Sequence, residues 1–262
     1  MISRQDFASI VERHTARGPL APWRERIIRD WSFECFVLTS QAPSIGVVGE
    51  HRLGGLPDLP ADLPYPHIGG EALSFLCQLN LSQLDDARLP SHGMLYFFIG
   101  NIEEPDNLEV RVMHSVAPIT SLVPAAAPTA PLRSESDNYF SNPHSITVAP
   151  SVRLYDSYKP SVDGLENDAC EAYDALCDHW EDSEYEHTLL GVGFSDYTDP
   201  RVVAADHHVG TKAEDWITLA TFGFDKKVGF SFWDAGQISL MIERDALAAA
   251  DFSRVHGYLY SS

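Results

Sequence analysis

The stretch GGLPDLPADLPYP, from Gly54 to Pro66, decides the predicted fold. Each of its prolines fixes φ and lacks a backbone donor, which excludes a helix or a central strand here. The stretch leads directly into LSFLCQLNL (Leu73–Leu81), one of the most apolar runs in the chain. We therefore predict a stiff, extended ribbon that loses little conformational entropy on ordering. Such a ribbon can cross the rim of a sheet and deliver the following strand in a fixed register.

Three leucines of this ribbon, Leu56, Leu59 and Leu63, alternate with its prolines. Apolar side chains in this pattern favour burial against the neighbouring sheet. We prefer this structural interpretation to a PxxP motif that another protein would recognise.

Further elements follow from hydrophobic periodicity. Helical spacing predicts helices over residues 4–17 and within Gly164–His187. The prolines between Pro118 and Pro160 predict long loops with two short strands, near Ser145–Ala149 and Ser151–Tyr155. Runs rich in aromatic and β-branched residues predict the remaining strands, at Trp31–Ser40, Ile45–Gly55, Met94–Gly100, Leu108–Ser115, Asp215–Asp225, Gln237–Ile242 and the C-terminal RVHGYLYSS.

Two apolar strand pairs match each other along the chain. LSFLCQLNLSQL precedes GMLYFFI, and WITLATFGFD precedes GQISLMIERDAL; Gly93 and Gly236 lead the second strands. When Phe75 is aligned with Ile217, the two separations differ by one residue. We therefore predict an α+β fold built from two related β-rich halves.

The length of the chain, 262 residues, suits one large domain with a substantial core. We predict a single domain over residues 1–262. Its parts are an N-terminal helix and strand (1–44), a first β-rich half (45–117), a Pro-rich irregular insertion (118–163), and the acidic helix with the second β-rich half (164–262).

The formal net charge is −20, from 38 acidic and 18 basic residues. An anionic surface repels the nucleic-acid backbone, so we expect no direct nucleic-acid binding and favour a basic protein partner. No run approaches the roughly 18 apolar residues of a membrane helix, and the N-terminus lacks the apolar core of a signal peptide. Four cysteines without a CxxC pair suit a reducing compartment. We expect a soluble, cytoplasmic protein without membrane contact.

The ribbon and its flanks resemble a known family. GGLPDLPADLPYP, EALSFLCQLNLSQL and LPSHGMLYFFI are similar to the opening half of the YwqG-like family, a bacterial domain of unknown function. The resemblance covers roughly residues 45 to 260. A departure is Gly193, which stands where a family member usually has proline. Three further segments agree with the family: HTLLGV (His187–Val192), DWITLATF (Asp215–Phe222) and WDAGQISLMIERDALAAADFS (Trp233–Ser253).

This resemblance implies a duplicated, largely antiparallel β-structure with a few flanking helices. The family brings no established catalytic residues, so none are assigned. Some of its genes lie near bacterial toxin systems, and the resemblance therefore implies an immunity or antitoxin-like role.

Candidate metal ligands gather in AADHHVG, where Asp206, His207 and His208 adjoin, with Asp196 and Asp199 upstream. Carboxylate and imidazole are suitable ligands. Adjacent histidines on a strand point to opposite faces, however, so at most one could join a single site. We interpret them as surface-loop histidines and predict neither a metal nor a cofactor.

Catalytic motifs are missing from the sequence. GxSxG and HExxH do not occur, and GVGFSD (Gly191–Asp196) lacks the GxGxxG spacing of a phosphate-binding loop. Cys77 lies in an apolar strand, where burial raises a thiol pKa and favours core packing. We therefore predict no catalytic residue and lean against an enzyme.

Polar residues inside the apolar strands have two interpretations. Gln78 and Asn80 share one strand face, and Asp234 follows Trp233 in the turn WDAG. Asp234 suits a tight turn, and a buried Gln78 needs hydrogen-bond partners that the sequence does not show. The alternative is a ligand cleft between the two halves, lined by Gln78, Trp233 and Asp234.

The segment from Gly164 to His187 is rich in acidic residues and has no lysine or arginine. Ala169, Tyr173, Leu176 and Trp180 form one apolar helical face, and the acids occupy the remaining surface. A solvated face is the default interpretation. The sharper hypothesis is that this helix meets a cationic partner, with these binding residues: Glu171, Asp174, Asp178, Glu181 and Asp182.

The leading functional hypothesis is a non-catalytic cytoplasmic protein-binding module. In its most concrete form it is an immunity or antitoxin-like protein that neutralises a basic toxin through its acidic surface. The alternative is an enzyme or a small-ligand-binding protein that uses the cleft near Gln78, Trp233 and Asp234.

Overall fold

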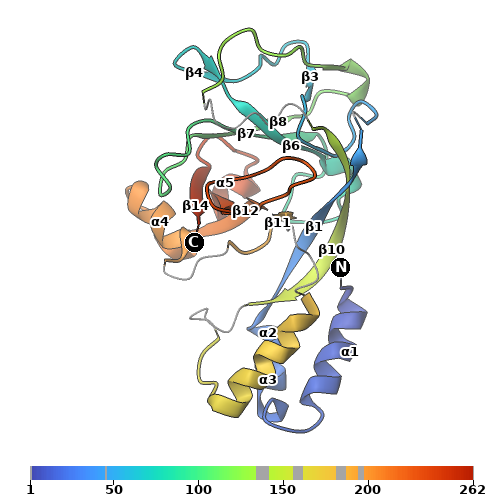
Figure 1. The fold of residues 1–262 in the computed structure, drawn as a ribbon, viewed down its shortest axis with the longest axis vertical. Helices are drawn as coiled ribbons and strands as arrows, with labels where there is room; N and C mark the ends of the chain where they lie inside the picture. Colours follow the sequence, from blue (N-terminus) through green and yellow to red (C-terminus); the bar gives the residue numbers. More distant parts are fainter. Residues whose placement is uncertain are drawn as a thin grey trace.

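A single antiparallel sheet of ten strands organises the molecule (Figure 1). The computed structural model describes residues 2–44, 46–133, 142–155, 162–180, 187–193 and 198–261. Across the sheet the order is β14 (His256–Tyr260), β13 (Gln237–Glu243), β12 (Trp216–Phe222), β11 (His187–Leu189), β1 (Ser32–Pro43), β10 (His144–Leu154), β2 (Arg52–Leu53), β6 (Ser74–Asn80), β7 (Met94–Ile99) and β8 (Val110–Ser115). The prediction of an α+β fold with a largely antiparallel sheet is confirmed.

The sheet curls until its two edges meet. Leu108, just before β8, donates its N–H to Gly257 O of β14 at 3.0 Å, and Leu259 donates to Pro105 O at 2.8 Å. Apolar side chains of both hairpins fill the interior, where the rings of Phe97 and Phe222 pack edge to face with centroids 5.5 Å apart. The result is a nearly closed barrel around one large core.

The two hairpins, β6–β7 and β12–β13, repeat each other in atomic detail. Each has a register break, at Leu76 in the first and at Leu219 in the second. The bulge carbonyls accept equivalent bonds, from Gly54 N and from Leu190 N, both at 2.8 Å. These two donors lie in the left-handed region, with φ of 63° and 59°.

A pair of histidines extends this repeat. Nδ1 of His51 accepts the N–H of Asn80 at 3.1 Å, and Nδ1 of His187 accepts the N–H of Gly223 at 3.2 Å. The two related halves are therefore confirmed, with an alignment one residue away from that of the sequence. The bulges make Phe75 equivalent to Thr218, because these two residues lie directly before the bulge residues Leu76 and Leu219.

The Pro-rich ribbon covers the outer face of the first hairpin, as predicted. Leu59 packs there against Phe75, Tyr96, Phe98 and Leu122, whereas Leu56 and Leu63 are half-buried. Short strands fix the ribbon and its continuation, namely β3 (Asp58–Pro60) paired with β9 (Leu122–Pro124), and β4 (His67–Ile68) paired with β5 (Glu71–Ala72).

A buried ion pair holds the start of the ribbon. Arg52 and Asp58, with side chains 6% and 1% exposed, pair beneath it, and Asp58 Oδ2 also accepts Gly49 N at 3.0 Å. Gln78 also binds Asp58, since its Oε1 accepts the N–H of Asp58 and its Nε2 donates to Asp58 Oδ2, both at 2.7 Å. Tyr96 Oη donates to the Asp58 carbonyl at 2.6 Å. These bonds fix where the chain leaves β2.

The predicted irregular stretch between Pro118 and Pro160 differs from the structure. Besides β9, it contributes one continuous strand, β10, where the sequence predicted two short ones. Pro150 lies inside β10 opposite Phe36 of β1. Proline is tolerated there because β2 pairs with β10 only at His144 and Ser145, so no strand among the described residues pairs with Pro150 on that side.

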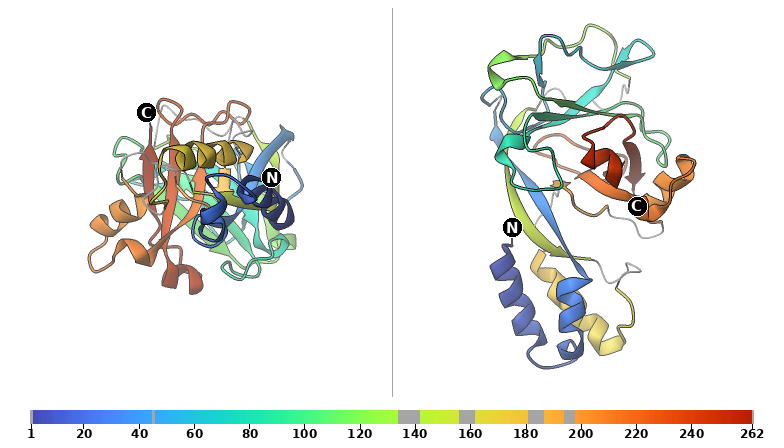
Figure 2. Two further views of the ribbon diagram at one scale, coloured as in Figure 1. Left: turned by 90° about the horizontal axis from the view of Figure 1, so that it is seen from below. Right: turned by 180° about the vertical axis from the view of Figure 1, so that it is seen from behind.

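A small helical unit sits on the far ends of β1 and β10, away from the barrel (Figures 1 and 2). Its own core includes Val11, Trp31, Tyr173 and Leu176. The Arg26 guanidinium lies over the rings of Trp23 and Trp31. The unit comprises α1 (Arg4–Thr15), η1 (Ala21–Trp23), α2 (Arg24–Arg29), α3 (Asn167–Cys177) and η4 (Asp178–Trp180).

The remaining helices flank the barrel. They are η2 (Leu81–Gln83), η3 (Ile119–Ser121), α4 (Pro200–His207), η5 (Ala213–Asp215) and α5 (Arg244–Ala248). Within the described part of the chain, no helix combines the length and the apolar character needed to span a bilayer.

We expect the Arg52–Asp58 pair to dominate the stability of the first half. Asp58→Ala leaves a buried guanidinium without its counter-ion, so the free energy of unfolding should fall by about 3–5 kcal/mol. The double variant Arg52→Met/Asp58→Leu should lose less than the sum of the two single losses. Denaturant unfolding of the single and double variants measures this. Asp62→Ala, at an exposed ribbon residue, is the control with a loss under roughly 0.5 kcal/mol; additive losses would contradict the expectation.

Candidate functional site

The face of α3 that points away from the core of the helical unit is the candidate functional site. Tyr173 and Leu176 are fully buried in the core cluster that they share with α1, Trp31 and Val152 of β10, and the Trp180 indole donates to Val152 O at 2.7 Å. The predicted apolar face of this helix is therefore confirmed. Because the apolar side chains hold one side of α3, its carboxylates occupy the other.

Five carboxylates of this segment are exposed, and none forms an ion pair with another described residue: Glu166, Asp168, Glu171, Asp174 and Asp178. They form what we call the acidic face. Two other predicted partner-binding residues, Glu181 and Asp182, lie outside the described residues. A nearby acid, Asp163, differs, since it pairs with Arg26.

The charge order at the C-terminal end of α3 opposes the helix itself, whereas Asp168 in the first turn suits the helix dipole. The last turn contains no basic residue, and Asp178 caps the C-terminus, where the helix dipole is already negative. Asp174 and Asp178 are also four residues apart, at a spacing where like charges repel. Packing through Tyr173 and Leu176 must offset these terms for the helix to form.

The residues of the predicted ligand cleft occupy different environments. Gln78 is completely buried on β6. Its side-chain amide forms hydrogen bonds with Asp58 and donates Nε2–H to Glu50 O at 2.8 Å. Trp233 is 50% exposed in the turn before β13, with a left-handed φ of 51°, and Asp234 follows it at the surface. The structure thus gives Gln78 a structural task, and a cleft shared by these residues stays a prediction.

The predicted core role of Cys77 agrees with the structure. Its side chain is fully buried on β6, and this burial raises the pKa of the thiol well above its usual value. A thiol in this state is a poor nucleophile at neutral pH.

His207 and His208 lie at the C-terminal end of α4, not on a strand. Asp199 caps this helix by accepting Arg201 N at 2.9 Å, and Pro200 opens it, which is the usual start signal. The two histidines lie beside His256 of β14, with ring centroids 5.1 and 5.4 Å away.

These histidines do not assemble with carboxylates. Among the described residues, no group of three or more His, Cys, Asp or Glu side chains is placed to hold a metal ion. Asp199 instead binds Arg201, and Asp196 lies outside the described residues.

His256 joins the two edges of the barrel. It is 3% exposed, and its Nε2 donates to the Asp106 carbonyl at 2.8 Å, in the segment that bonds β14. Burial, reinforced by His207 and His208, lowers its pKa from 6.5 to about 4. The barrel therefore closes around a neutral imidazole.

Fold and site together define a duplicated, largely antiparallel β protein with flanking helices and an acidic helical surface. A family model described as a domain of unknown function, DUF1963, matches residues 51–259. The chain therefore belongs to this family. The matched range begins at His51, the first repeat-related histidine, and ends inside β14. No curated protein gives a significant match.

Acidification should destabilise the fold through His256. Between pH 6.5 and about 4 the unfolded chain binds the proton and the folded chain does not, so the free energy of unfolding should fall as the pH drops. We expect this pH dependence to become shallower in His256→Gln, measured by urea unfolding between pH 7 and 4.5. Half-buried His51, whose pKa is also lowered to about 4 by burial, contributes to the slope that remains. Exposed His92→Gln is the control; equal slopes in both variants would contradict the assignment.

Proposed function

We propose that this protein is a non-catalytic protein-binding module that docks a basic protein on the acidic face of α3. Its most concrete form is an immunity or antitoxin-like protein that neutralises a basic toxin. We also propose that the YwqG-like resemblance of its sequence and the family match describe the same relationship. A bacterial, cytoplasmic setting belongs to this proposal.

The observation that carries the proposal is the unfavourable charge order at the C-terminal end of α3. Helix stability alone favours lysine or arginine in the last turn, yet Asp174 and Asp178 stand there. A residue pattern that costs the helix stability is expected where it serves another purpose, such as binding.

Electrostatics suits such an encounter. The chain carries a net charge of −20, so its field attracts a cationic partner over long range. The acidic face belongs to the helical unit that projects from the barrel (Figure 1). Complementary charges in that position accelerate association and reject partners of the same sign.

The acidic face is also rigidly presented. Tyr173 Oη donates to Tyr155 O at 2.8 Å, and the rings of Trp31 and Tyr173 pack edge to face with centroids 5.4 Å apart. A face that is ordered before binding loses little conformational entropy when a partner docks. A rigid face favours recognition of one folded partner over adaptation to many different partners.

The triple variant Glu171→Lys/Asp174→Lys/Asp178→Lys tests the proposal. It should leave the protein folded, and should raise the free energy of unfolding by up to about 1 kcal/mol, because the new cations suit the end of the helix. It should also remove partner binding. Affinity capture from the cells that make the protein, at low and high salt, followed by rate measurements with each captured protein, measures both effects.

A matched control carries the same change in net charge elsewhere. Asp62→Lys/Glu103→Lys/Glu104→Lys alters exposed acids on the barrel and should retain partner binding. Capture of basic proteins by wild type and this control, but not by the α3 variant, supports the proposal. Capture of the same proteins by the α3 variant, or association rates that do not respond to salt, would contradict it. Rescue of growth when the captured protein is co-expressed then distinguishes immunity from ordinary binding.

A further inference from the structure

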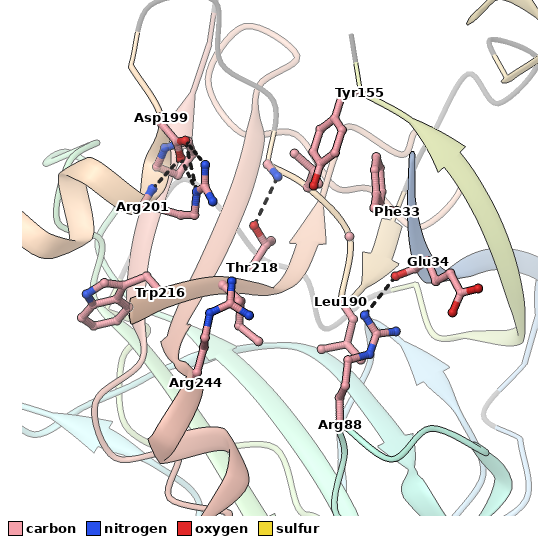
Figure 3. Close-up of a pocket in the computed structure, with 15 residues that line it drawn as sticks. Phe33, Glu34, Arg88, Tyr155, Leu190, Asp199, Arg201, Trp216, Thr218 and Arg244 are labelled. Atoms are coloured by element: carbon pink, nitrogen blue, oxygen red, sulfur yellow. Dashed lines mark hydrogen bonds and ion pairs between the residues drawn. The ribbon is translucent and has the colours of Figure 1, made fainter. Parts of the chain in front are cut away.

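We propose that a pocket beside the second hairpin binds a small organic oxyanion, a carboxylate or a phosphate monoester, between its arginine side chains (Figure 3). The pocket has a volume of about 230 Å³. It lies between the start of β1, the segment that follows β11, the start of β12 and the first turn of α4. This inference is independent of the proposed partner binding by α3.

The internal repeat explains why a cavity exists here. Thr218, which lines the pocket, occupies the position that Phe75 has in the first hairpin. Phe75 is sealed by Leu59 of the Pro-rich ribbon. In the second half, a short hydroxyl side chain replaces the ring, and Gly193 donates its N–H to Thr218 Oγ1 at 3.4 Å. One outer face is thus filled with apolar side chains, and the equivalent face retains a cavity.

Three arginines from three separate elements reach this cavity: Arg88 from the loop after η2, Arg201 from α4 and Arg244 from α5. Two carboxylates, Glu34 and Asp199, also line the pocket, so its lining residues carry a net charge of +1 (three arginines against two acids), whereas the whole chain carries −20. Figure 3 shows Arg88 and Arg244 on one side of the pocket and Arg201 beside Asp199. Guanidinium groups bind carboxylate and phosphate through paired N–H donors.

Arg88 and Arg201 are held in place by their own carboxylates. Arg88 Nη2 donates to Asp86 at 2.6 Å and its Nη1 donates to Glu34 O at 3.2 Å. Arg201 Nη2 donates to Asp199 at 2.6 Å. These hydrogen bonds raise the pKa of both guanidinium groups, which keeps them charged.

Arg244 is the cation left for a ligand. Its Nε donates to Glu214 O at 3.0 Å, which orients the guanidinium, and no carboxylate of the described residues pairs with it. Its remaining N–H donors are therefore available to an oxyanion. In a chain with a net charge of −20, a bound anion needs this local positive charge to offset repulsion from the rest of the surface.

Aromatic side chains complete the pocket and limit what fits. Phe33 and Tyr155 pack together with ring centroids 5.0 Å apart, and Trp216 lines the other side. The volume is below the roughly 300–1,000 Å³ of pockets for drug-sized ligands. We therefore expect one small apolar group, such as a single ring, attached to the anionic group.

Calorimetric titration at low salt with defined probes tests this site. We expect binding of benzoate or phenyl phosphate, and the probe that binds more tightly identifies the class of oxyanion. Inorganic phosphate reports the anionic contribution alone, and neutral benzyl alcohol should not bind. Arg244→Gln should weaken binding about tenfold or more, because a hydrogen bond to a charged group is lost.

Two further variants locate the binding and keep the test decisive. Arg17→Gln removes an exposed charge that follows α1 and is not among the lining residues of the pocket, and should leave the affinity within about twofold of wild type. Thr218→Phe introduces the residue of the first hairpin and should fill the pocket, which abolishes binding; if this variant does not fold, Arg244→Gln decides. Failure of every anionic probe to bind, equal effects of Arg244→Gln and Arg17→Gln, or binding of benzyl alcohol as tightly as benzoate would overturn the proposal.

Discussion

The architecture depends on one backbone hydrogen bond that occurs twice. A residue in the left-handed region, Gly54 or Leu190, donates to the carbonyl at a hairpin bulge, Leu76 or Leu219. This bond turns the chain away from its short strand and onto the outer face of the hairpin. Leucine accepts a conformation that costs it about 1 kcal/mol or more because the turn is required at that point. The Pro-rich ribbon on the first hairpin and the Gly191–Gly193 segment beside the second both begin from this turn.

Charge is distributed unequally within the helical unit. Six of the 18 basic residues of the chain lie between Arg4 and Arg29, on and around α1 and α2, whereas α3 has none. The Arg26–Asp163 ion pair joins the two groups, yet the outer carboxylates of α3 remain beyond its reach. The helical unit therefore contains cations that could neutralise carboxylates, but none of the described ones pairs with the carboxylates of the acidic face. This separation makes α3 a directed electrostatic feature rather than a share of a uniformly negative surface.

Local patterns predicted the fold better than the sites. Proline spacing and alternating leucines predicted the ribbon, and helical periodicity predicted the buried face of α3, because both depend on neighbours in sequence. The Arg52–Asp58 pair and the three pocket arginines depend on segments far apart in the chain, for which no spacing rule exists. Helix α4 is not among the helices that the sequence predicts, although Asp199 followed by Pro200 is a helix start signal. The alignment of the repeats from the sequence is one residue off because it pairs Phe75 with apolar Ile217, whereas the equivalent residue, Thr218, is polar and gives no hydrophobic signal.

Divergence of the two halves accounts for both the sealed face and the pocket. Arg52 and Gln78, which pin the ribbon in the first half, correspond to Thr188 and Thr221 in the second, where the two hydroxyls bond each other at 2.8 Å. Hydroxyl side chains are too short to reach a carboxylate in the following segment. The position of Tyr96 is taken by buried Ser239, whose hydroxyl has no hydrogen-bond partner among the described residues. Once these anchors were absent, the second outer face no longer required a ribbon, and arginines from α4, α5 and the loop after η2 could converge on the space.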